Sequence, residues 1–117
     1  MRSNVIERIM QVIRIIAPEI IEYYIPEMSK IEEGKQIRLS ATATGSPPFE
    51  VHWFKDGKPV QDSTNIEMSV DQNVYFLKIL NPTKADFGEY KVELKNSAGL
   101  VEKIMKMEQK GTSQRIS

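Results

Sequence analysis

His52 is the only histidine of the chain and the first candidate for catalysis or metal binding. A serine-type triad needs a histidine beside an acid and an activated serine, and a zinc site would need several carboxylates here because the chain has no cysteine. No Gly-x-Ser-x-Gly motif is present, and the acids do not cluster at ligand spacing. His52 alternates with Val51 and Trp53, which places it on the outer face of a strand. We interpret it as a solvated surface residue and expect no catalytic residue, no metal site and no cofactor.

The other polar motifs also favour turns and surface positions over chemistry. The paired acids Glu32 and Glu33 lie at a turn, and no glycine-rich phosphate loop is present. The glycines are instead spaced as turn residues, at Gly45, Gly57, Gly88 and Gly99. Lysine and arginine number 16 and aspartate and glutamate 16, without a dense basic run, so nucleic acid is not expected as the main partner. The function is therefore expected to lie in protein binding at the surface.

The length and composition predict one soluble domain with short extensions. The chain has 117 residues, of which 40% are hydrophobic and 27% charged. A small extracellular β-domain commonly depends on disulfides, so the absence of cysteine favours a cytoplasmic location. The apolar N-terminus is interrupted by Glu7, Arg8 and Arg14, so it fits neither a signal peptide nor a membrane span.

Short alternating segments separated by turn residues predict an all-β sandwich or barrel. Residues 18–26 have proline at both ends, which favours an edge strand. Asp56-Gly57 is a two-residue hairpin signal, because both positions tolerate positive φ. Thr83 and Asp86 have the spacing of a short capped turn. Inward faces are expected from the alternating apolar residues Ile37, Leu39, Ala41, Ala43, Tyr75, Leu77, Ile79, Tyr90, Val92 and Leu94.

Residues 18–108 carry several motifs of one known family. Gly45-Ser46-Pro47-Pro48 precedes the segment VHWFKDG at 51–57, and YFLKI at 75–79 is followed by DFGEY at 86–90 and KNSAG at 95–99. This stretch resembles the intermediate-set (I-set) immunoglobulin domains of titin, twitchin, obscurin and myosin-binding protein C. The resemblance implies a two-sheet Greek-key sandwich. Its structural signature maps to Ala41, Trp53, Leu77, Asp86, Gly88, Tyr90 and Val92.

Two departures from the family pattern have consequences. The family's two cysteines correspond to Ala41 and Val92, so a bridge worth about 4 kcal/mol in the chain-entropy model is missing and packing around Trp53 must offset it. Such a loss fits a reducing compartment. The resemblance also implies a basic partner for Asp86, but the nearest candidates here are Thr64 and Asn65. We expect backbone N–H groups of its own turn to satisfy this carboxylate, or the carboxylate to be more exposed.

Residues 1–17 have two interpretations. Residues 5–12 (VIERIMQV) match residues 100–107 (LVEKIMKM) in type, which favours the last strand of a preceding, similar domain in a tandem array. Apolar residues of 3–16 also fall on one helical arc, which favours an amphipathic helix. A helix at 3–16 is a possible target of a calmodulin-like calcium sensor.

These observations define the expected organisation and function. We expect an N-terminal extension or linker at 1–17, the immunoglobulin-like domain at 18–109 and a flexible tail at 110–117. The leading hypothesis is a structural and protein-interaction module of a muscle or cytoskeletal protein, located in the sarcomere or cytoskeleton. Its expected partners are neighbouring immunoglobulin domains or other muscle and cytoskeletal proteins, with no membrane partner. Binding is expected at two edge strands, through Ile20, Ile21, Tyr24, Ile104, Met105 and Met107.

Overall fold

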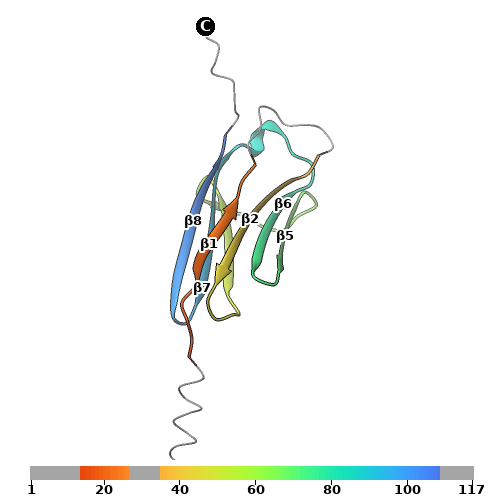
Figure 1. Cartoon of the computed structure of the whole chain (residues 1–117). Helices are drawn as coiled ribbons and strands as arrows, with labels where there is room; N and C mark the ends of the chain where they lie inside the picture. The colour runs from red at the N-terminus through yellow and green to blue at the C-terminus, as the bar shows by residue number, and fades with distance from the viewer. Residues whose placement is uncertain (1–13, 27–34, 109–117) are drawn as a thin grey trace, which may run out of the picture.

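The computed structural model describes residues 14–26 and 35–108, which form two four-stranded antiparallel sheets packed face to face (Figure 1). The first sheet has the strand order β1-β2-β6-β5 and the second the order β4-β3-β7-β8. The strands are β1 (Glu19–Tyr24), β2 (Ile37–Thr44), β3 (Glu50–Lys55), β4 (Lys58–Pro59), β5 (Ile66–Asp71), β6 (Val74–Ile79), β7 (Gly88–Asn96) and β8 (Gly99–Met107). A short 3-10 helix, η1 (Lys84–Asp86), connects β6 to β7. The expected two-sheet sandwich is confirmed.

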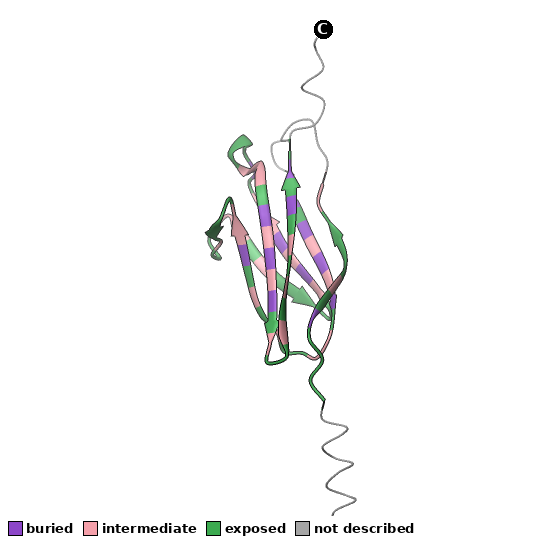
Figure 2. Ribbon diagram, turned by 90° about the vertical axis from the view of Figure 1, so that its left-hand side faces the viewer, coloured by how far each residue is buried: buried purple, intermediate pink, exposed green. Residues whose placement is uncertain are grey.

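The core lies between the sheets and follows the period-2 pattern of the sequence. Buried and less buried residues alternate along β2, β6 and β7 (Figure 2). Trp53 on β3 is 2% exposed and lies opposite Val92 on β7. The buried hydrophobic residues are Ile37, Leu39, Ala41, Ala43, Trp53, Tyr75, Leu77, Ile79, Tyr90, Val92, Leu94, Met105 and Met107. At 25 cal/mol per Å² of apolar area, about 2 kcal/mol is gained for each large side chain of this kind that leaves water.

The β3–β4 hairpin has the turn that its two central residues predict. Asp56 has φ 50° and Gly57 has φ 85°, and Lys55 pairs with Lys58 across them. Two successive left-handed residues give a turn whose twist matches that of the flanking strands. The hairpin therefore ends β3 sharply and leaves β4 as a two-residue edge strand.

The described chain runs from one end of the sandwich to the other. Residues 14–18 have no regular secondary structure and approach β1 at one end, while β8 runs toward the opposite end (Figure 1). Residues 14–16 of the proposed helix are therefore not helical. Residues 1–13 and the tail at 110–117 lie outside the described residues, so the domain boundaries stay predictions. Within the described part, no helix has the length and apolarity required to span a membrane.

Candidate protein-interaction surfaces

Five of the signature residues, Ala41, Trp53, Leu77, Tyr90 and Val92, are buried in the sandwich, and Asp86 and Gly88 are half-buried. Ala41, Leu77 and Val92 are fully buried. Tyr90 is 1% exposed, and its hydroxyl donates a hydrogen bond of 2.6 Å to the carbonyl oxygen of Asp86. Burial, reinforced by the nearby carboxylates of Asp86 and Asp56, raises the pKa of Tyr90 well above its usual range. The phenol therefore stays a hydrogen-bond donor and ties β7 to η1.

Asp86 is satisfied within its own turn. Its Oδ2 accepts the backbone N–H of Thr83 at 2.8 Å, and the Thr83 hydroxyl accepts the N–H of Ala85 at 3.3 Å. These reciprocal bonds form a capping box at the start of η1. Of the two alternatives that the sequence left open, the structure shows backbone satisfaction.

Asp56 makes a connection that the sequence did not indicate. Its carboxylate accepts the N–H of Glu89 at 3.0 Å and a bond from Lys55 Nζ at 2.8 Å, and its own N–H donates to Glu89 oxygen at 2.8 Å. The bond from Lys55, then that from Glu89, lowers the pKa of Asp56. Gly88 has φ 155°, and a Cβ there would lie 2.9 Å from both carboxylate oxygens. Glycine at this position allows the β3–β4 turn to bind the start of β7.

Three residues from separate parts of the chain hold the segment that leads into β1. The Ile16 N–H donates to Ser46 Oγ at 2.8 Å, and the Ser46 N–H donates to Ile16 oxygen at 3.0 Å. Asn96 Nδ2 donates to Ile16 oxygen at 2.8 Å and to Ser46 oxygen at 3.0 Å. We call Ile16, Ser46 and Asn96 the linker clamp. It was not predicted, because the partners are separated by 30 and 80 positions.

The linker clamp is closely packed and leaves two apolar side chains outside. A Cβ on Gly45 would lie 2.8 Å from Ala17 oxygen, so the loop and the incoming segment are in backbone contact. Asn96 Oδ1 also accepts the N–H groups of Ala98 and Gly99, which fixes the β7–β8 turn. Ile15 and Ile16 are 51% and 57% exposed at this end of the sandwich. The linker clamp fixes the direction in which residues 14–18 approach β1. The side chains of Ile15 and Ile16 remain available for contact with the part of the protein that precedes them.

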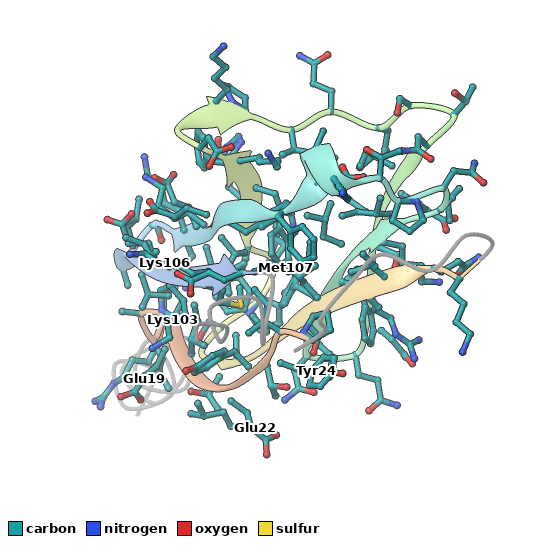
Figure 3. All side chains as sticks on the ribbon, turned by 90° about the horizontal axis from the view of Figure 1, so that it is seen from above. Glu19, Glu22, Tyr24, Lys103, Lys106 and Met107 are labelled. Atoms are coloured by element: carbon teal, nitrogen blue, oxygen red, sulfur yellow. The ribbon has the colours of Figure 1, made fainter. Side chains whose placement is uncertain are left out.

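The two edge strands predicted to bind partners lie beside each other but in different sheets. β1 pairs with β2 and β8 pairs with β7, and β1 contacts β8 across the side of the sandwich. Lys103 Nζ lies 4.4 Å from the centre of the Tyr23 ring and joins the two edges. Figure 3 shows Glu19, Glu22 and Tyr24 on β1 and Lys103 and Lys106 on β8, with Met107 inside the sandwich.

The register divides the predicted edge residues into exposed and buried ones. Ile21, Tyr24 and Ile104 are exposed. Met105 and Met107 are 2% and 0% exposed, because they lie opposite Tyr90 and Gly88 and face inward. Their assignment to a binding edge is therefore corrected: both close the core. Ile20 is half-buried and packs against the core, so it is also not part of the exposed edge.

The outward residues of β8 form an exposed surface along one edge of the second sheet. We define the β8 surface as Leu100, Glu102, Ile104 and Lys106, which lie opposite the outward residues of β7. Lys91 beside it bonds Glu102 at 3.2 Å and Glu93 at 3.4 Å, and these carboxylates raise the pKa of Lys91. Leu100 and Ile104 are 52% and 53% exposed. The β8 surface thus combines an edge strand with two exposed aliphatic side chains among charges.

His52 lies on the outer face of β3, as its alternation predicted. It is exposed, and its Nε2 is 3.4 Å from Glu50 Oε2. Among the described residues, no group of three or more histidine, aspartate or glutamate side chains is arranged to hold a metal ion.

Comparisons with known proteins agree on one family. The model of the immunoglobulin I-set domain matches residues 23–108. Titin of Drosophila melanogaster is 39% identical over 72 residues, which is 62% of this chain and 0%, to the nearest per cent, of that protein. Human myomesin-2 is 36% identical over 76 residues, 64% of this chain and 5% of that protein. The chain thus spans only a small part of these curated relatives.

Solved structures give the same result for the fold. Titin domain M7 has a TM-score of 0.69 and 28% identity, covering 80% of this chain and 94% of that one. The titin domains Z1Z2, solved in complex with telethonin, have a TM-score of 0.69 and 26% identity, covering 80% of this chain and 47% of that one.

Proposed function

Because this chain belongs to the immunoglobulin I-set family, we propose that it is a spacer and docking module of a muscle or cytoskeletal protein, located in the sarcomere or cytoskeleton of the cytoplasm. The module is non-catalytic, and its relatives include titin and myomesin-2. The observation that carries the docking role is the β8 surface. An edge strand has main-chain groups free on one side, and a partner strand can pair with them while its side chains contact Leu100 and Ile104.

The expected partner is another protein of the sarcomere or cytoskeleton. A two-domain titin fragment has been solved in complex with telethonin, and its domains are similar to this chain. This supports a protein partner at an exposed surface of the present domain. No described feature favours the calcium-sensor alternative, whose residues 3–13 lie outside the described residues.

The spacer role is supported by the linker clamp and by the path of the chain. The incoming segment is held at one end by bonds from Ser46 and Asn96, and β8 runs toward the other end. A module of this kind holds the domain before it and the domain after it in a fixed relative orientation. The exposed Ile15 and Ile16 then contact the preceding domain. This agrees with the tandem-array interpretation of residues 5–12.

Localisation in muscle cells tests the proposal. We expect the fluorescently tagged chain, expressed in cultured striated muscle cells, to form periodic bands. Ile104→Lys places a charge at the centre of the β8 surface without touching the core, and we expect it to disperse the bands. Thr64→Lys adds the same charge at an exposed residue outside β8 and serves as the control. Diffuse fluorescence of the wild-type chain would refute sarcomeric docking, and unchanged bands in Ile104→Lys would refute the β8 surface.

A further inference from the structure

An apolar groove opens between β3 and β5, on the side of the sandwich away from β1 and β8. Its volume is about 470 Å³, within the range of ligand sites. Its lining includes Pro48 and Phe49 from the β2–β3 loop and Met68 and Val70 from β5. Trp53, Val51 and Tyr75 also line it, and no lining residue is charged. The groove is therefore an uncovered section of the space between the sheets.

Val70 shows how open this section is. Val70 alternates with Ile66 and Met68, so it lies on the core-facing side of β5, and yet it is 56% exposed. Within the described residues, β4 consists only of Lys58–Pro59 and so shields little of the groove beside β3. β5 is the edge strand of its own sheet. An aliphatic side chain on the inner face of a strand is normally covered, so a stabilising contact is missing here.

The edge of β5 beside this groove has free main-chain groups. Leu80 donates to Asn65 oxygen, so in the antiparallel ladder residues 65, 67, 69 and 71 point toward β6, and residues 66, 68 and 70 point outward. The side chains of Ser63 and Asp62 accept the N–H groups of Ile66 and Met68. In the described part of the chain, nothing bonds the Met68 carbonyl or the N–H and carbonyl of Val70. A strand of two or three residues can pair with these groups.

The Tyr75 hydroxyl also lacks a partner among the described residues. Tyr75 is 7% exposed, and its ring packs edge-on against Phe49 with centroids 6.1 Å apart. Its hydroxyl makes no hydrogen bond within the described residues, and burial raises the pKa of Tyr75. Buried phenols usually find a partner, so this one is available to a ligand or to water.

The rim of the groove is acidic. Asp62 accepts the N–H of Met68, and Asp71 follows Val70 at the end of β5. Glu50 and Glu67 lie on the outer faces of β3 and β5, opposite Lys95 and Lys78, and do not contribute to this rim. An uncharged groove with carboxylates around it favours a ligand that is apolar in the middle and basic at both ends.

We propose that this groove is a second protein-binding site, where an extended peptide segment of a partner pairs with Met68 and Val70, inserts one apolar side chain between Val70 and Phe49, and places flanking lysine or arginine residues near Asp62 and Asp71. The site is independent of the β8 surface, because it lies on the opposite edges of the two sheets. Two different partners can therefore be held at once.

A titration of the isotope-labelled full chain with short peptides tests this site. The probe is the blocked peptide Lys-Thr-Leu-Thr-Lys, followed by backbone amide shifts in NMR spectra. We expect the largest shifts at Phe49, Val70 and Gln72. Glu-Thr-Leu-Thr-Glu and Lys-Thr-Ser-Thr-Lys are matched controls for charge and for the apolar side chain, and each is expected to bind at least about tenfold more weakly.

Two lysine substitutions distinguish this site from the β8 surface. Val70→Lys should weaken binding of the leucine peptide at least about tenfold, whereas Ile104→Lys should leave it unchanged. The indole signal of Trp53 reports in each variant that the sandwich is folded. Equal affinity for the three peptides, shifts confined to β8, or no shifts would overturn the proposal.

Occupation of the groove by this chain itself would also overturn it. Without peptide, β5 shifts that change with protein concentration would mean that a second copy fills the groove. β5 shifts that change in Ile9→Lys would mean that the N-terminal residues fill it. We expect neither change.

Discussion

Asn96→Asp separates the two roles of Asn96 with a change of one atom. The Oδ1 that accepts the N–H groups of Ala98 and Gly99 is kept. Nδ2, which donates to Ile16 oxygen and Ser46 oxygen at 2.8 and 3.0 Å, becomes a carboxylate oxygen facing two carbonyl oxygens. The β7–β8 turn is therefore retained while the linker clamp loses its central donor.

The expected cost follows from the two lost bonds. A protein hydrogen bond contributes about 1 kcal/mol net, so we expect Asn96→Asp to lose about 2 kcal/mol of unfolding free energy at neutral pH. For a domain of this size that lowers the Tm by roughly 8–16 °C. The unfavourable carbonyl contacts raise the pKa of the new carboxyl in the folded state. The loss is therefore complete above that pKa and falls to about half below about pH 4, where the carboxyl is protonated in both states and its single O–H replaces one of the two N–H donors.

Urea unfolding and NMR relaxation measure the two consequences. Trp53 fluorescence gives the unfolding midpoint, and amide order parameters at Ile15 and Ile16 report the linker. We expect wild-type order parameters near about 0.85 and a fall below about 0.6 in Asn96→Asp. Ser97→Ala, in the same turn but exposed, is the control and should change neither. Unchanged order at Ile15 and Ile16 in Asn96→Asp would refute the linker clamp, whatever the stability.

Three further substitutions test the core and its turns. Trp53→Ala removes the largest buried side chain and should cost roughly 3–5 kcal/mol, so a cooperative urea transition at the wild-type midpoint would contradict its place in the core. Tyr90→Phe removes the 2.6 Å bond to Asp86 oxygen and should cost roughly 1–3 kcal/mol in thermal or urea unfolding, whereas a neutral result would mean that the bond is replaced by water. Asp56→Asn tests pH dependence: the folded-state pKa of Asp56 is lowered, so its contribution is present above the unfolded value of 3.8 and is lost as pH falls through the folded pKa. Thermal melts of this variant should therefore vary less with pH below 3.8 than those of the wild-type chain, and parallel profiles would count against the interaction.

Much of the fold was predictable because its signals are local. Alternation in β2, β6 and β7 assigned the inward faces correctly, and Asp56-Gly57 predicted its own turn geometry. The spacing of Thr83 and Asp86 also predicted the capping box that the structure contains. Each of these features depends on residues within a few positions of one another.

The surfaces were less predictable because they depend on pairing between distant strands. Met105 and Met107 share a strand with Ile104, and only the register of β8 with β7 places them inside and Ile104 outside. Val70 has an inward position in the pattern, but its exposure depends on how little of the neighbouring sheet covers it.

The sequence by itself determined that this chain is an all-β I-set sandwich with Trp53 at its centre and without a disulfide, because period-2 alternation, turn residues and family motifs are properties of short segments. Only the tertiary structure decided how Ile16 meets Ser46 and Asn96 and which apolar residues stay in water. Contacts across 30 and 80 positions exist only after the two sheets have packed, so no local pattern encodes them.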